Sequence, residues 1–336
     1  MVERRLPTRC RILYVGRTAV AVLAIIPAGL NTLAANVAAE ERVAVRRDED
    51  RGLISFHVDG KEAFVYRHGA DLDLPHLYPI RSPSGRPMTV QRTEPYPHHR
   101  SFWFADTVEL AGARRASFYN AWHSRADAAD AEPSFRDRIR HVDFALGKNE
   151  ADRVSATVKL VWEIDGKTPV LDERREMVIV ALGDGEYLLD IEFALTASYG
   201  DVRFASDAVH YAWPYVRMSS EWSVDRGGTI ANSQGGKNQK GTNDQVAAWV
   251  DYSNTVEGRT EGLAIFSHPR NEQPHRWLTR DYGTFGPRRV DEKSGRPFVA
   301  GKGESIAQRV GILVHKGDAT SGRVADRYRD YCESFR

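Results

Sequence analysis

The densest group of residues that could do chemistry lies at 96–103, with the sequence YPHHRSFW. Successive side chains of an extended segment point to opposite faces, so His98 and His99 are poorly placed to bind one metal ion together. A histidine that faces a pocket can act as a general acid or base near neutral pH. Arg100 shares the side of His98 and can bind a carboxylate, phosphate or oxyanion. His98, His99 and Arg100 are therefore candidate catalytic residues, and Trp103 is a candidate for substrate binding. The alternative is a structural loop with hydrogen-bonded histidines.

Two further segments combine a histidine with aromatic residues. Residues 210–215 have the sequence HYAWPY, and Trp122 directly precedes His123. Aromatic rings beside a histidine can form a platform for the C–H face of a sugar, although such rings are by default part of a core. On the functional hypothesis His210 is a catalytic candidate, and Trp213 and His123 bind substrate.

A third segment, HPRN at 268–271, lies one residue after the apolar residues 263–266. A strand here would deliver His268 to its end, which is a common location for site residues. We therefore expect His268 to be catalytic, and Asn271 and the nearby Arg276 to bind substrate. The alternative is a hairpin connection that is capped by its own side chains.

Several other kinds of chemistry lack the residues that they need. The chain has 11 histidines but no HExxH motif, no cysteine pair and no EF-hand loop, so we predict no metal site. We also predict no cofactor, because there is no P-loop and no dinucleotide fingerprint. No GxSxG motif is present, which disfavours a serine hydrolase of that type. The net charge is only +1 over 336 residues, which argues against a nucleic-acid partner.

The first 39 residues have the layout of a secretory signal peptide. Five arginines precede an apolar run at 19–30, and small residues follow as far as Ala39. The run is too short for a membrane-spanning helix, which needs about 20 residues. We therefore expect a signal peptide at 1–39, a periplasmic or secreted protein, and no membrane span after cleavage.

The remaining residues must supply the scaffold, and their main pattern has a period of two. Apolar residues alternate with other residues at 153–163 and at 186–196, and Gly, Asp, Asn and Pro separate the apolar runs. Many strands with short turns and no helices between them indicate antiparallel sheets. We therefore predict an all-β fold: one large antiparallel β-sandwich domain at 40–336, with a C-terminal helix at 322–335.

Several blocks of sequence resemble a bacterial family of unknown function labelled "methane oxygenase PmoA". They are LYPIRSPSGRPMT (77–89), PHHRSFWFA (97–105), IANSQGG (230–236), AAWVDYS (247–253) and EGLAIFSHPRN (261–271). The resemblance implies an exported β-rich protein connected with polysaccharide breakdown, with a supersandwich similar to galactose mutarotases. Methane oxygenase subunits are membrane copper proteins, so the label does not describe this chain. The resemblance points to the residues His98, His99, Arg100, Trp103, His268, Pro269 and Asn271. The sequence departs from the family pattern after Ala105 and at 206–218, which leaves the substrate open.

The function that these features favour is an exported carbohydrate-active enzyme. It would act on a glycoside, a sugar or another small polar substrate by histidine acid–base chemistry, as a hydrolase, lyase or epimerase. The alternatives are a non-catalytic glycan-binding module and a cell-surface interaction protein. The enzyme hypothesis requires residues 98–100, 210 and 268 to lie together at the opening of one binding pocket.

Overall fold

The computed structural model describes residues 41–125, 134–205, 212–272, 276–289 and 298–335. The predicted signal peptide and His210 lie outside these residues. In the described part of the chain no helix is long and apolar enough to span a membrane.

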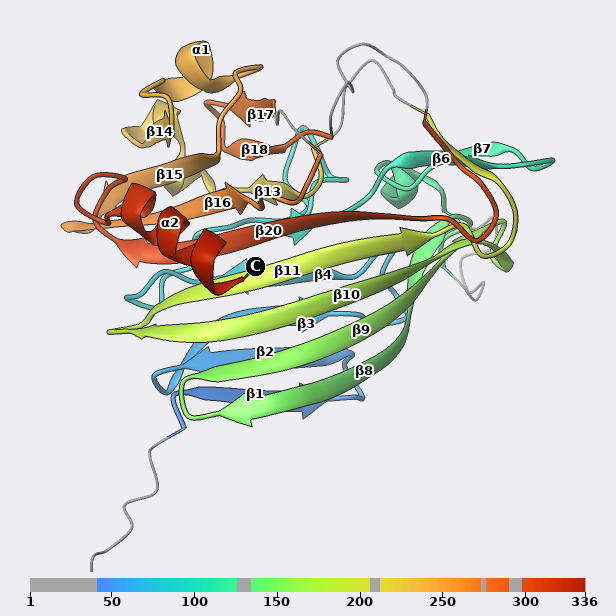
Figure 1. Ribbon diagram of the computed structural model, residues 1–336, viewed down its shortest axis with the longest axis horizontal. Coiled ribbons are helices and arrows are strands. Elements are labelled where there is room, and N and C mark those ends of the chain that lie inside the picture. The colour runs from blue at the N-terminus through green and yellow to red at the C-terminus, as the bar shows by residue number, and fades with distance from the viewer. Residues whose placement is uncertain (1–40, 126–133, 206–211, 273–275, 290–297, 336) are drawn as a thin grey trace, which may run out of the picture. The chain divides into compact units, whose positions relative to one another are not determined.

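Two eight-stranded sheets form the body of the fold (Figure 1). The first contains, in spatial order, β1 (Val43–Asp48), β2 (Leu53–Val58), β3 (Lys61–Arg67), β4 (His76–Ile80), β5 (Phe102–Trp103), β13 (Tyr215–Arg217), β18 (Thr284–Pro287) and β17 (Trp277–Arg280). The second contains β14 (Thr229–Asn232), β15 (Trp249–Val256), β16 (Arg259–Ser267), β20 (Ser305–Lys316), β11 (Glu186–Thr196), β10 (Thr168–Gly183), β9 (Arg153–Ile164) and β8 (Arg138–Glu150).

The smaller elements complete the described chain. A four-stranded sheet contains β19 (Phe298–Ala300), β12 (Val202–Phe204), β6 (Thr107–Leu110) and β7 (Arg115–Ser117). The helices are α1 (Asn238–Thr242), α2 (Val324–Ser334) and the short 3₁₀ turns η1 (Ala121–His123), η2 (Ser220–Trp222) and η3 (Val224–Arg226).

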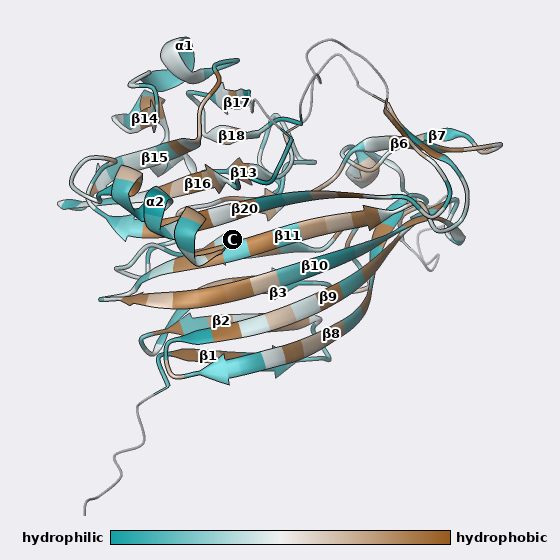
Figure 2. Cartoon of the chain, viewed as in Figure 1, coloured by the Kyte–Doolittle hydropathy of each residue, from teal (hydrophilic) through white to brown (hydrophobic). Residues whose placement is uncertain are grey.

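The core lies between the two large sheets because their strands alternate as the sequence predicts. In β9, Val154, Ala156, Val158, Leu160 and Trp162 are buried, and most residues between them are partly exposed. Figure 2 shows the same alternation of hydrophobic and hydrophilic residues along several strands of the second sheet. Rings from the two sheets meet in the middle: Phe102 lies 6.1 Å from Phe193.

Helix α2 covers the outer face of the second sheet. Val324 and Tyr331 pack on a separate apolar cluster that includes Phe266 and Leu313, and the Tyr331 hydroxyl donates a hydrogen bond of 2.9 Å to Asp190. This helix explains why β16 and β20 are buried on both faces. All strand pairings among the described residues are antiparallel. The predicted antiparallel sandwich with a C-terminal helix is confirmed.

Candidate functional site

Three short neighbouring strands of the first sheet place polar and aromatic side chains on the face opposite to the second sheet. Tyr215 of β13 pairs with Trp103 of β5, and Arg217 pairs with Thr284 of β18. Phe102 contacts Phe193 of the second sheet, so alternation turns Trp103, Tyr215 and Arg217 to the opposite face of the first sheet. Trp103 and Tyr215 are fully buried there, in the same hydrophobic cluster as Phe102, Val216 and Phe285. The rings of Trp103 and Tyr215 stack at 4.8 Å.

The segment before β5 adds a histidine and a tyrosine to this face. Tyr96 and His99 close a turn in which the His99 amide donates to the Tyr96 carbonyl at 2.9 Å. The same turn stacks their rings at 4.8 Å, and Tyr96 also stacks on Tyr282 at 5.6 Å. The His99 Nε2 lies 3.0 Å from the Tyr119 hydroxyl. We call these residues the tyrosine–histidine cluster; its members are Tyr96, His98, His99, Trp103, Tyr119, Tyr215, Arg217 and Tyr282.

The cluster extends from solvent to the sheet. His123 is exposed, Tyr96, His98 and Tyr282 are half-buried, and His99, Trp103 and Tyr119 are buried. His98 Nδ1 lies 3.3 Å from His123 Nε2. The structure therefore brings together four of the residues that the sequence singled out: His98, His99, Trp103 and His123.

Arg100 holds the segment in place and does not face the cluster. Its guanidinium is fully buried, forms an ion pair of 2.6 Å with Asp73 and donates to the carbonyls of Pro97 and His99. Its central carbon also lies 4.9 Å from the ring of Trp122, which Arg92 and Arg125 contact as well. Trp122 belongs to η1, so these contacts fix the turn that carries His123.

The two histidines are neutral at physiological pH. Burial, with a smaller contribution from His98 and nearby arginines, lowers the pKa of His99 to about 3. Burial and the neighbouring His123 lower the pKa of His98 to about 4. Burial also raises the pKa of Tyr282. A neutral imidazole can accept a proton or a hydrogen bond from a ligand.

Several buried polar atoms of the cluster have no hydrogen-bond partner in the described part of the chain. They are Nδ1 of His99, Nε1 of Trp103 and Nε of Arg217. A buried polar group without a partner costs about 1–3 kcal/mol, so such groups are rare in folded proteins. Other residues of the described chain, such as His68 and Asn232, also have such an atom. In this cluster three of them lie among aromatic rings, as in a binding site for a polar ligand.

The other predicted site residues lie elsewhere. His268 is at the end of β16, where its Nε2 donates to the Phe335 carbonyl at 2.6 Å and its Nδ1 accepts from the Arg270 amide at 3.1 Å. Asn271 bonds both backbone groups of Arg309 at 2.6 and 2.8 Å. These contacts join β20 and the end of α2, and none of them reaches His98 or His99. The expected meeting of the 268–271 segment with residues 98–100 is therefore not observed.

Trp213 and Arg276 also have structural surroundings. The indole of Trp213 is fully buried, packs on Phe104 and donates to Asp106 at 2.9 Å. Arg276 is exposed and donates to the Asp244 carbonyl at 2.7 Å. Neither belongs to the tyrosine–histidine cluster.

One family model matches most of the chain. A model of a family of unknown function, DUF6807, matches residues 53–329. The chain belongs to the DUF6807 family. No curated protein matches this DUF6807 chain, and the match neither supports nor opposes the resemblance to the PmoA-labelled family.

Several solved structures are distantly similar to this DUF6807 protein. The GH36 α-galactosidase AgaB from Geobacillus stearothermophilus is 8% identical with a TM-score of 0.46, over 83% of this chain and 42% of that one. The α-galactosidase from Lactobacillus brevis is 8% identical with a TM-score of 0.41, over 82% and 40%. A mutant of the heparan sulfate lyase HepC from Pedobacter heparinus is 10% identical with a TM-score of 0.36, over 82% and 37%. The DUF6807 chain spans about two fifths of the length of these structures, and likeness at this level does not assign an activity.

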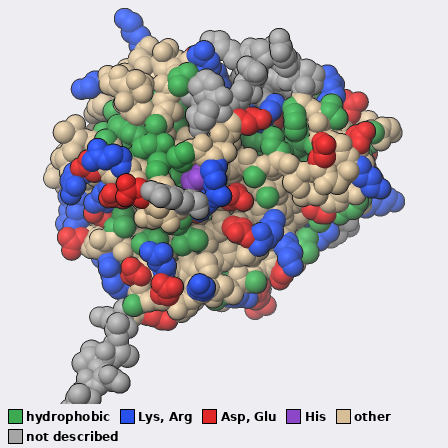
Figure 3. Space-filling model, in the orientation of Figure 1, with side chains coloured by type: hydrophobic (Ala, Val, Ile, Leu, Met, Phe, Trp, Pro, Cys, Tyr) green, Lys and Arg blue, Asp and Glu red, His purple; other side chains and the backbone are tan. Residues whose placement is uncertain are grey.

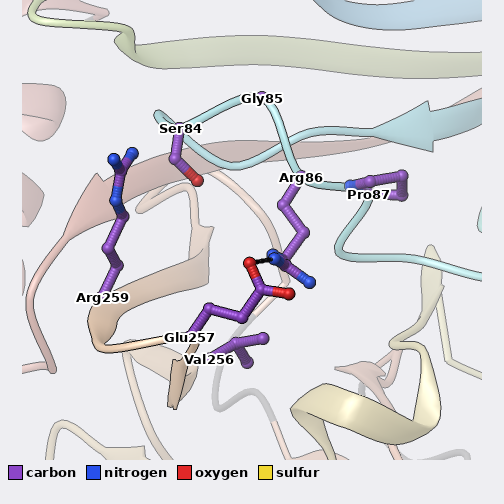
Figure 4. Close-up of a pocket in the computed structure, with 7 residues that line it drawn as sticks. All are labelled: Ser84, Gly85, Arg86, Pro87, Val256, Glu257 and Arg259. Atoms are coloured by element: carbon purple, nitrogen blue, oxygen red, sulfur yellow. Dashed lines mark ion pairs between the residues drawn. The ribbon is translucent and has the colours of Figure 1, made fainter.

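A pocket of about 540 Å³ lies away from the tyrosine–histidine cluster (Figure 4). It is formed by the loop Ser84–Pro87 and by Val256, Glu257 and Arg259 around the β15–β16 turn. Arg86 spans it and forms an ion pair with Glu257. The face seen in Figure 3 likewise mixes basic and acidic side chains, in agreement with the balanced composition. In the pocket, Arg86 and Glu257 neutralise each other, and Arg259 lines it without an ion pair among the described residues.

The described ranges contain no group of three or more His, Cys, Asp or Glu side chains that could hold a metal ion. Five members of the cluster in this DUF6807 protein were not among the site residues predicted from the sequence: Tyr96, Tyr119, Tyr215, Arg217 and Tyr282. The alternation of Tyr215 and Arg217 around the apolar Val216 was the available signal.

Proposed function

We propose that the tyrosine–histidine cluster binds a saccharide and that His99 acts there as a general base in a carbohydrate-active enzyme. The observation that carries the proposal is the coincidence, in one cluster, of aromatic rings, unpartnered buried donors and a neutral imidazole. Saccharides present both apolar C–H groups and hydroxyls, and tyrosine and tryptophan rings with polar tips match that combination.

His99 suits the role of base through the contact on its other nitrogen. When Nε2 carries the proton and donates to the Tyr119 oxygen at 3.0 Å, Nδ1 keeps its lone pair. Nδ1 is one of the buried atoms that have no partner in the described residues. A substrate hydroxyl placed against Nδ1 can then donate to His99 while Tyr119 holds the ring in orientation. Transfer of its proton requires that the bound substrate raise the pKa of His99, which burial, His98, Arg217 and Arg100 hold at about 3 in the free protein.

The test compares two buried histidines of the full chain, His99 and His268. A panel of oligosaccharides is first screened for binding by calorimetry and for turnover by product analysis. His99→Gln is expected to reduce turnover strongly with little change in binding, and His268→Gln is expected to leave both unchanged. Binding without turnover in the unaltered protein would instead favour the non-catalytic glycan-binding module. Equal loss of turnover in both variants would contradict the assignment of His99.

A further inference from the structure

Arg217 differs from every other buried arginine in the described part of the chain. Four of them pair with an acidic side chain: Arg100 with Asp73, Arg175 with Glu173, Arg288 with Asp244 and Arg289 with Glu272. Arg217 is 8% exposed and forms no ion pair with any described residue. A buried charge without a counter-ion is costly, so this position requires an explanation.

The surroundings of Arg217 are polar but not anionic. One nitrogen, Nη1, donates to the Tyr282 carbonyl at 2.7 Å and to the Thr284 hydroxyl at 3.3 Å. The guanidinium also lies over the Tyr282 ring, with its central carbon 4.5 Å from the ring centre. Tyr252, Tyr96 and Tyr119 are the next groups that act on its charge. These contacts orient the guanidinium, and none of them neutralises it.

The contacts of Nη1 leave the edge of the guanidinium formed by Nε and Nη2, and this edge can bind a carboxylate. Among the described residues, the buried Nε has no partner and Nη2 forms no hydrogen bond. The Nε and Nη2 donors lie side by side in one plane and can donate to the two oxygens of a carboxylate in parallel. Trp103 Nε1 and His99 Nδ1 in the same cluster remain for hydroxyl groups.

We propose that the saccharide bound at the tyrosine–histidine cluster is a uronic acid whose carboxylate pairs side-on with Arg217. This inference rests on the proposed function and names its substrate class. The ligand then supplies the counter-ion that the other buried arginines obtain from Asp or Glu side chains.

The experiment uses oligogalacturonides and oligoglucuronides with the full chain, and compares each with its methyl ester. The ester keeps the shape of the sugar and removes the charge. The acid is expected to bind at least about 30-fold more tightly than the ester, as for a buried charge pair. Arg217→Met should abolish that preference while ester binding is kept. Arg217→Lys keeps the charge but loses the parallel donors, and should lose at least about tenfold in affinity for the acid. Arg81→Lys is the matched control: this arginine pairs with Glu62 at 2.8 Å outside the cluster, and its variant should retain the preference.

The outcomes separate the two proposals. Equal binding of acid and ester by the unaltered protein would overturn the uronic acid assignment and leave saccharide binding intact. Equally tight binding of sulfated oligosaccharides that lack a carboxylate would show that the site accepts anions in general, and would overturn the uronic acid assignment as well. Binding of neither acid nor ester nor neutral parent sugars would overturn the proposed function, and this inference with it. If Arg217→Met does not fold, as judged by circular dichroism, two measurements still test the uronic acid assignment. They are the comparison of acid with ester in the unaltered protein and the affinity of Arg217→Lys for the acid.

Discussion

The two histidine segments that stand out in the sequence, 98–100 and 268–271, differ in how completely the fold satisfies their polar atoms. At His268 both ring nitrogens have backbone partners, and Asn271 is bonded through both its oxygen and its nitrogen. At His99 one nitrogen contacts Tyr119 and the other has no partner among the described residues. Both histidines are almost fully buried, at 2% and 3% exposure, so burial alone does not distinguish them.

This difference separates a structural role from a binding role. A side chain whose hydrogen bonds all go to its own chain has nothing left for a ligand, and its contribution is to stability. A buried side chain with an unused donor or acceptor carries a cost that a ligand can remove. The comparison therefore predicts that changes in the two segments affect different measurements.

The largest effect is expected for the proposed base. His99→Gln should lower kcat by about 10²–10⁴-fold, because the variant cannot accept a proton in the transition state. Substrate affinity should change by less than about threefold, since glutamine keeps hydrogen-bonding groups at the position. Steady-state kinetics on the best oligosaccharide of the panel measures both. A loss confined to KM would show that His99 binds substrate without transferring a proton.

Substitutions in the segment 268–271 should lower the stability of the protein and leave its activity unchanged. Asn271→Ala removes two hydrogen bonds to Arg309. The Arg309 amide loses the Asn271 oxygen that it donates to, while the Arg309 carbonyl keeps the His268 amide at 3.2 Å. The free energy of unfolding should fall by about 1–3 kcal/mol, as measured by urea denaturation. A fall in kcat for the folded variant would instead return the 268–271 segment to the active site.

The pH dependence of stability offers an independent check of the state of His99. Burial lowers its pKa from 6.5 to about 3 in the folded chain. Between these values the unfolded chain binds one more proton at this position, so stability falls as the pH decreases. The slope for this histidine is about 1.4 kcal/mol per pH unit. His99→Gln should therefore show a flatter dependence of the unfolding free energy between pH 6 and pH 4 than the unaltered protein. Parallel curves would mean that His99 is protonated as readily in the folded as in the unfolded state.

The smallest effect is expected at the pocket of Figure 4. Arg86 pairs there with Glu257, and the site is exposed to solvent. Arg86→Gln should change saccharide affinity by less than about twofold, because exposed ion pairs contribute little. A tenfold loss in calorimetry would move the binding site from the cluster to this pocket.

The sequence predicted the scaffold better than the site, for physical reasons. Alternation at 153–163 identified β9, because a strand between a core and solvent must alternate. His98 and His99 could be found because the residues of their segment are contiguous. Arg217 and Tyr282 meet only because β13 pairs with β18, and one sequence does not reveal that pairing. Trp213 was expected to bind substrate, but its side chain packs in the core and its indole bonds to Asp106.

A crystal structure of the full chain with a bound oligosaccharide tests the central claim most directly. The account predicts a sugar within hydrogen-bond distance of Nδ1 of His99 and of Nε of Arg217, with Tyr96 and Tyr282 beside it. A sugar bound in the pocket of Arg86 and Arg259, or against helix α2 beside His268, with the tyrosine–histidine cluster unchanged, would contradict it.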